Sequence, residues 1–235
     1  KMNIAQNLKR VRERIKIAAL KAQRNVGEIK LVAVSKGIEA ESVIEAAKCG
    51  IKSFGENYAK EFSDKYDLVE KAVGKKVEWH FVGRLQRNKV KYILDKVKLI
   101  HSLDSVSIAE EINKRAEKIE TKVSVLIELN TNEETKGGVR FDQIEVFLLE
   151  LMRFPQIEIK GFMIMPPFFD NPEMTRPYFR NVRELRDKLQ GRFPSLRELS
   201  MGMSGDFEVA IEEGATIVRI GTAIFGARVV TIQSH

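Results

Sequence analysis

The stretch KLVAVSK, residues 30–36, contains a short apolar run with a lysine at each end. Leu31 to Val34 are typical of a buried β-strand, and Lys36 follows one small residue beyond its end. Burial disfavours the charged form of lysine, so a lysine at the exit of a buried strand is typical of a reactive amine or an anion site. The alternative is a lysine that simply extends into solvent.

The rest of the chain repeats this arrangement of a short apolar run followed by a helical periodicity. The predicted strands are KLVAVS at 30–35, KSFGE at 52–56, EWHFVG at 78–83, KLIHSL at 98–103, VSVLIEL at 123–129, IKGFMIM at 159–165, LRELSMG at 196–202 and TIVRIG at 216–221. The helical patterns between them lie at 39–49, 56–73, 87–94, 105–118, 141–151, 174–190 and 206–212. Strands that alternate with helices form parallel sheets with helical crossovers.

Eight predicted strands in 235 residues favour a closed (β/α)₈ TIM barrel over an open doubly wound sheet, because such barrels typically take about 250 residues. The spacing of Ile4, Leu8, Val11 and Ile15 predicts an additional amphipathic helix before the barrel. We therefore predict a single domain over residues 1–235, with the helix at about 3–25 and the barrel at about 30–228.

The composition argues against a membrane or exported protein. Hydrophobic residues make up 43% of the chain, enough for a full core, yet no apolar run approaches the roughly 18 to 20 residues of a membrane span. The N-terminal region has basic residues but no apolar signal core. The single Cys49 excludes an internal disulfide and is typical of a reducing compartment. We expect a cytoplasmic protein with no membrane partner.

The net charge of +7 would suit a nucleic-acid binder. However, the basic residues alternate with acidic ones along most of the chain, and no zinc-finger spacing or aromatic RNA-binding motif accompanies them. His80, His101 and His235 lack the spacing of a metal site, and the first two fall within predicted strands, where core histidines are common. We therefore expect no nucleic-acid partner and no metal, and we expect a monomer.

Two glycine-containing loops follow the seventh and eighth predicted strands, SMGMSGD at 200–206 and RIGTAIFG at 219–226. Catalytic groups of TIM barrels lie at the carboxyl ends of the strands, and phosphate sites frequently use these two loops. Glycines let backbone N–H groups approach an anion, although ordinary turns also use Gly and Ser. Together with Lys36 at the first strand, the two loops favour a ligand that carries a phosphate.

A lysine opposite a phosphate site suggests two chemistries. One is a Schiff base with a phosphorylated substrate, as in class I aldolases, and the other is an internal aldimine with pyridoxal 5′-phosphate (PLP). Arg219 favours the second, because it ends the last strand just before the predicted phosphate loop and could lie beside the pyridine ring.

Five motifs between residues 30 and 226 together resemble the pyridoxal phosphate homeostasis protein family, namely LVAVSK, FGENY, WHFVGRLQRNK, HSLD and SMGMSGDFEVAIEEGATIVRIGTAIFG. The resemblance implies a PLP-binding barrel like the N-terminal domain of alanine racemase. It also implies a cytoplasmic role in buffering PLP or delivering it to apo PLP-dependent enzymes, without established catalytic turnover.

Carried over motif by motif, the resemblance assigns roles to particular residues. Lys36 would hold PLP as the internal aldimine, Asn57 would line the cofactor face and Arg219 would face the pyridine nitrogen. The phosphate would be held by Ser200, Ser204, Gly221 and Thr222. The motif GRLQRNK keeps the family's Gly83, Leu85, Gln86, Asn88 and Lys89.

The chain departs from the family after Lys36, where SKGIE replaces the frequent Ser-Lys-Thr-Lys-Pro and so lacks a second lysine and a proline. Lys136 of ETKGG keeps the family spacing and is a candidate for a secondary PLP-handling lysine. The alternative function is a PLP-dependent amino-acid racemase or a related fold-type III enzyme. Against it, the chain ends nine residues after AIFG, which leaves no room for the second domain that supplies a tyrosine base in alanine racemases.

Overall fold

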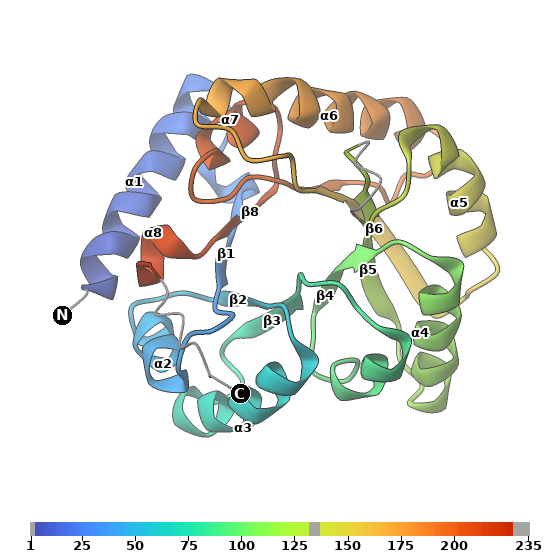
Figure 1. Cartoon of the computed structure of the whole chain (residues 1–235), viewed down its shortest axis with the longest axis horizontal. Coiled ribbons are helices and arrows are strands. Elements are labelled where there is room, and N and C mark those ends of the chain that lie inside the picture. The colour runs from blue at the N-terminus through green and yellow to red at the C-terminus, as the bar shows by residue number, and fades with distance from the viewer. Residues whose placement is uncertain (1–2, 132–136, 228–235) are drawn as a thin grey trace, which may run out of the picture.

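Parallel strands form a closed barrel in the computed structural model, which describes residues 3–131 and 137–227 (Figure 1). The strands follow the chain order around the barrel: β1 (Lys30–Val34), β2 (Ser53–Glu56), β3 (Glu78–Phe81), β4 (Leu99–Leu103), β5 (Val123–Leu129), β6 (Ile157–Ile164), β7 (Glu198–Ser200) and β8 (Ile217–Ile220). β1 pairs with β8 and closes the ring. The predicted TIM barrel is confirmed.

Helices surround the barrel on its outside (Figure 1). They are α1 (Ile4–Lys21), α2 (Ala40–Lys48), α3 (Ala59–Val73), α4 (Val106–Lys118), α5 (Ile144–Leu151), α6 (Arg176–Gln190), α7 (Phe207–Glu212) and α8 (Thr222–Phe225). The segment predicted as a helix at 87–94 contains a 3₁₀ helix, η2 (Arg87–Tyr92), in which i→i+3 bonds such as Lys89 N–H to Gln86 O replace α-helical ones. Short connectors commonly adopt this tighter geometry.

The additional N-terminal helix α1 packs against α7 and α8. The Asn3 side chain caps it by accepting a hydrogen bond from the Gln6 N–H at 3.0 Å. It ends earlier than predicted, at Lys21, because Gln23 takes a left-handed φ of 56°. Just beyond α1, Arg24 Nη1 donates to the carbonyls of Ile211 and Ala215, both at 2.8 Å. The helix and these bonds brace the α7 region, which follows the SMGMSGD loop.

A bulge in β6 sets the register at one side of the barrel. Gly161 has a φ of 156°, and a Cβ there would lie 1.8 Å from the Glu198 carbonyl oxygen. Only glycine permits this approach, and the register beyond it pairs Met163 with Ser200. The end of β6 is thereby placed beside β7.

Alternation along the strands places polar residues on the inner face of the barrel. Val32, Leu99, Leu126, Met163 and Ile217 form a separate buried apolar cluster. Side chains two positions apart on a strand share a face, so His101, Glu128 and Arg219 follow Leu99, Leu126 and Ile217 on that face. The inner face thus turns from apolar to polar toward the carboxyl ends of the strands.

None of the helices within 3–131 and 137–227 is long and apolar enough to cross a membrane.

Candidate functional site

A pocket of about 310 Å³ lies at the carboxyl ends of β1 and β8. Five of the residues predicted from the sequence line it together: Lys36, Ser204, Arg219, Gly221 and Thr222. Arg219 lies in β8, and the other four come from the segments that follow β1, β7 and β8, which are far apart in the chain. The closure of the barrel brings the lysine and the two glycine-containing loops into one cavity.

Lys36 lies in a turn after β1 and is half-buried. Gly37 follows it with a left-handed φ of 67° and donates its N–H to Glu61 Oε1 at 2.6 Å. Just before Lys36, the Ser35 hydroxyl donates to Glu56 Oε1 at 2.5 Å. The residues on both sides of Lys36 are therefore held by hydrogen bonds, which fixes the position of the Lys36 backbone at the pocket.

A second lysine, Lys65 on α3, lies beneath this turn and was not expected from the sequence. Its Nζ donates to the Ser35 carbonyl at 2.7 Å and to Glu56 Oε1 at 2.6 Å. Burial raises the pKa of Glu56, and the Lys65 ammonium opposes that shift. Lys65 therefore supports the site from below, where its ammonium is held by two oxygen atoms and by Glu61.

Arg219 is buried, with 3% of its surface exposed. Its Nη1 donates to Ser200 Oγ at 2.6 Å and its Nη2 to the Ile164 carbonyl at 3.1 Å. Burial lowers the pKa of Arg219 to about 10, with Asp206 and Glu128 opposing the shift. The guanidinium therefore stays cationic at neutral pH while its orientation is fixed.

The two glycine-containing loops are bonded to each other. Ser204 Oγ accepts a hydrogen bond from the Ala223 N–H at 3.2 Å, across from one loop to the other. Within the first of these loops, Asp206 Oδ1 accepts a hydrogen bond from the Met203 N–H at 2.7 Å and holds the turn over residues 203–206. Gly205 and Gly221 leave the backbone open to the cavity. This combination of hydroxyl and backbone donors suits an oxyanion.

Two predicted residues do not line the pocket. Ser200 is completely buried, and its hydroxyl is engaged by Arg219 and by His101 Nδ1 at 2.8 Å. This geometry does not support the predicted phosphate contact of Ser200. Asn57 lies beside Gly83, where a Cβ would come within 2.2 Å of the Asn57 carbonyl oxygen. The Asn57 Oδ1 atom is buried without a hydrogen-bond partner in the described part of the chain.

The remaining motif residues vary in their placement. Gln86 and Asn88 are exposed, and Lys89 is half-buried with its Nζ 5.7 Å from the centre of the Tyr92 ring. Lys136 falls outside the described residues. The loop after β6 also lines the pocket, through Pro166, Pro167, Phe168 and Phe169, although the sequence reasoning did not select it. The Pro-Pro-Phe-Phe run directly after a predicted strand was the available signal.

Glu128, also missed from the sequence, lies on the inner face of β5. Burial and the neighbouring Asp104 raise its pKa to about 7. The folded state therefore holds this proton more tightly than the unfolded state, and the stability contributed by Glu128 is lost as the pH rises from about 4.5 to 7.

We expect the substitution Glu128→Gln to flatten this pH dependence. Between pH 5 and 8, the apoprotein should lose roughly 1 to 3 kcal/mol of unfolding free energy that the variant retains. Urea unfolding of both proteins across this range measures the difference. Parallel stability curves for the two proteins would show that Glu128 is not a shifted group.

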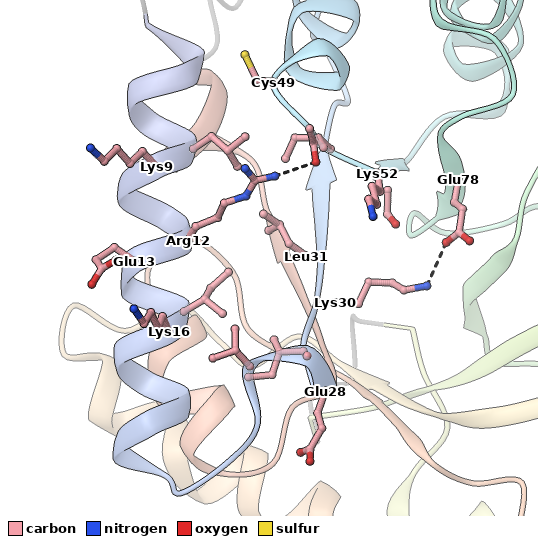
Figure 2. Close-up of a pocket in the computed structure, with 18 of the residues that line it drawn as sticks. Lys9, Arg12, Glu13, Lys16, Glu28, Lys30, Leu31, Cys49, Lys52 and Glu78 are labelled. Carbon is pink, nitrogen blue, oxygen red and sulfur yellow. Dashed lines mark hydrogen bonds and ion pairs between the residues drawn. The ribbon is translucent and has the colours of Figure 1, made fainter.

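A larger groove of about 1210 Å³ lies at the other end of the barrel, between α1 and the amino ends of β1 and β2. Figure 2 shows charged side chains of both signs around it, among them Lys9, Glu13 and Lys16 on α1 and an ion pair between Lys30 and Glu78. TIM barrels carry their chemistry at the carboxyl ends of the strands. The smaller pocket around Lys36 is therefore the candidate site.

Within the described ranges, no group of three or more His, Cys, Asp or Glu side chains is placed to hold a metal ion.

Comparison with known proteins relates the chain to one family. The model of the family described as "Alanine racemase, N-terminal domain" matches residues 2–229. The pyridoxal phosphate homeostasis protein of Aquifex aeolicus (strain VF5) is 50% identical over 229 residues, covering 97% of this chain and 99% of that relative. The chain belongs to the pyridoxal phosphate homeostasis protein family.

Solved structures agree with this family membership. PipY of Synechococcus elongatus PCC7942, solved with PLP bound, has a TM-score of 0.82 at 30% identity and covers 95% of this chain and 100% of its own. The alanine racemase of Corynebacterium glutamicum has a TM-score of 0.65 at 20% identity, with 97% of this chain and 63% of that chain covered. The racemase shares the fold.

Proposed function

We propose that this protein binds PLP at the Lys36 pocket and takes part in PLP homeostasis, as a cytoplasmic carrier that buffers the cofactor or delivers it to apoenzymes. The observation that carries the proposal is the meeting of Lys36, the buried Arg219 and the two bonded loops in one pocket of about 310 Å³. Membership of the pyridoxal phosphate homeostasis protein family and the PLP-bound PipY neighbour support it.

The residues present fit the cofactor. The amine of Lys36 would bond the aldehyde carbon, the donors around Ser204, Gly221 and Thr222 would hold the phosphate, and Arg219 would face the ring nitrogen. The Ser204 and Thr222 side chains and the backbone of Gly205 and Gly221 line the pocket, and hydroxyl and backbone N–H donors suit a phosphate. When bound, PLP supplies an aldehyde that an amine captures reversibly and a ring that can accept electrons.

Binding and delivery are tested separately. The purified apoprotein, titrated with PLP, should bind one equivalent and turn yellow, and the absence of saturable binding would refute the proposal. For delivery, the holoprotein is mixed with an apo aminotransferase. Reactivation faster than PLP dissociation from the carrier indicates direct transfer, whereas reactivation limited by that dissociation indicates buffering. Size-exclusion chromatography of the mixture shows whether the two proteins form a complex or stay monomeric.

An amino-acid racemase is the second candidate, favoured by the shared fold of the C. glutamicum alanine racemase. Arg219 argues against efficient catalysis, because a cation beside the ring nitrogen keeps it unprotonated and weakens electron withdrawal from the α-carbon. The pocket lining found in the described ranges also contains no tyrosine that could serve as a second base.

We expect the holoprotein to catalyse no proton exchange at the α-carbon of L-alanine beyond that of free PLP. Incubation in deuterium oxide, followed by mass spectrometry and chiral analysis, measures the exchange. The matched control is free PLP at the same concentration. Formation of the D-isomer that disappears in Lys36→Ala would establish the racemase instead.

A further inference from the structure

A series of buried polar side chains connects Arg219 to the opposite end of the barrel. Arg219 Nη1 donates to Ser200 Oγ at 2.6 Å, and this oxygen lies 2.8 Å from His101 Nδ1. His101 Nε2 lies 2.8 Å from His80 Nδ1, and His80 Nε2 lies 4.0 Å from the Glu78 carboxylate. The series crosses the barrel interior over β8, β7, β4 and β3.

The members inside the barrel are sealed from solvent. Ser200 and His101 are 0% exposed, and His80 is 1% exposed. The carboxylate at the far end is partly open, and Figure 2 shows Glu78 and Lys30 pointing toward each other as a 3.1 Å ion pair. Buried polar groups without partners are costly, so each hydrogen between Arg219 and His80 Nδ1 should meet an acceptor. His80 Nε2 has no hydrogen-bond partner in the described part of the chain, and its contact with Glu78 is electrostatic.

The two ends fix the direction of donation. Arg219 has only donors, so it fills one lone pair of the Ser200 oxygen. The ionised Glu78 has only acceptors, and the neighbouring His80 and Lys30 lower its pKa to about 2. An N–H on His80 Nε2 is attracted to this carboxylate, whereas a lone pair there would be repelled.

We propose that His80, His101 and Ser200 form a one-directional hydrogen-bond chain that holds the guanidinium of Arg219 in place. Ser200 donates its hydroxyl hydrogen to His101 Nδ1, and His101 donates from Nε2 to His80 Nδ1. Both imidazoles are therefore neutral and carry their hydrogen on Nε2. His80 and His101 are positioning residues that act on Arg219 through Ser200.

The opposite direction leaves the chain unsatisfied. If His101 carried its hydrogen on Nδ1, the Ser200 oxygen would accept hydrogen bonds from both Arg219 and His101. The Ser200 hydroxyl hydrogen would then have lost His101 Nδ1 as its acceptor. A doubly protonated His101 is also disfavoured, because the cationic Arg219 lowers its pKa. At the other end of the series, the cationic Lys30 lowers the pKa of both His80 and His101. Burial lowers the pKa of both His80 and His101, although Glu78 and Glu198 oppose the shift at His80.

The chain matters to the pocket because it fixes one of two acceptors that orient Arg219. Ser200 holds Nη1 and the Ile164 carbonyl holds Nη2, which leaves the remaining face of the guanidinium toward the pocket. A hydroxyl whose hydrogen is already donated to an imidazole is also a stronger acceptor. That this guanidinium meets the ring nitrogen of PLP rests on the proposed function.

The first experiment uses the apoprotein, so it is independent of PLP. Two-dimensional ¹H–¹⁵N NMR of the histidine rings reports which nitrogen carries the hydrogen, with His80→Asn and His101→Asn variants assigning the signals. Both rings should show the neutral Nε2–H tautomer between pH 5.5 and 8. A hydrogen on Nδ1 of either ring, or an imidazolium at pH 7, would overturn the proposal.

The second experiment compares His101→Leu with His101→Asn. The leucine removes the acceptor for the Ser200 hydroxyl, whereas the asparagine oxygen can occupy the place of Nδ1. We expect PLP to bind roughly tenfold more weakly to the leucine variant and within about threefold of wild type to the asparagine variant, as for one hydrogen bond of about 1.4 kcal/mol. The ¹⁵N shift of ring-labelled PLP should change only in the leucine variant.

The outcomes separate the two proposals. If wild type fails to bind PLP, the proposed function is wrong, and the tautomers of the apoprotein still decide the chain. If wild type binds and the leucine variant matches it in affinity and ¹⁵N shift, the positioning role is wrong. Ser200→Ala replaces His101→Leu if the latter does not fold, and it should reproduce the loss of affinity and the changed ¹⁵N shift.

Discussion

The substitution Lys36→Ala is expected to abolish covalent retention of PLP. Lys36 lines the pocket together with Arg219 and the two bonded loops, so the variant removes the amine that we propose bonds PLP. The visible absorption of lysine-bound PLP should disappear. After borohydride reduction and proteolysis, mass spectrometry of the wild type should find the pyridoxyl group on the peptide that contains Lys36.

The matched control is Lys89→Ala, which removes a half-buried lysine of a family motif that does not line the pocket. This variant should keep the visible band and the label on Lys36. A label found mainly on Lys89 or Lys136 in the wild type would contradict the assignment.

The double substitution Ser204→Ala, Thr222→Ala is expected to weaken PLP binding at least tenfold. Hydrogen bonds to a charged group contribute about 1.5 to 3 kcal/mol each, and about 1.4 kcal/mol corresponds to one factor of ten in affinity. Ser204 also ties the two loops together through the Ala223 N–H. Equilibrium dialysis or absorbance titration measures the dissociation constant.

Pyridoxal, which lacks the phosphate, is the control ligand for this prediction. It should bind poorly to the wild type and lose little further affinity in the double variant. Equal affinities of the wild type for PLP and pyridoxal would show that the loops do not form a phosphate site.

The nearby Lys65 is poorly suited to a covalent role. Lys65 is 6% exposed, and its ammonium is held by the Ser35 carbonyl, Glu56 and Glu61. An amine fixed as an ammonium ion among oxygen atoms is a poor nucleophile. Lys36 and Arg219 both line the pocket, whereas Lys65 does not.

The sequence by itself determined the fold class. Eight apolar runs alternate with helical patterns, and this periodicity follows from which side chains must be buried in strands and helices. It also selected Lys36, Ser204, Arg219, Gly221 and Thr222, because the carboxyl ends of parallel strands must meet at one end of a barrel. Each of these expectations depends on local pattern and on the topology that the pattern implies.

Only the tertiary structure decided the surroundings of these residues. Ser200 belongs to a motif with Ser204, yet its side chain points into the barrel and bonds Arg219 and His101, because strand alternation and the register beyond Gly161 place it there. Likewise, the raised pKa of Glu128 and the contact between His80 and His101 arise between strands in a low-dielectric interior. Such pairings depend on register and burial across the closed barrel, which no local stretch of the chain encodes.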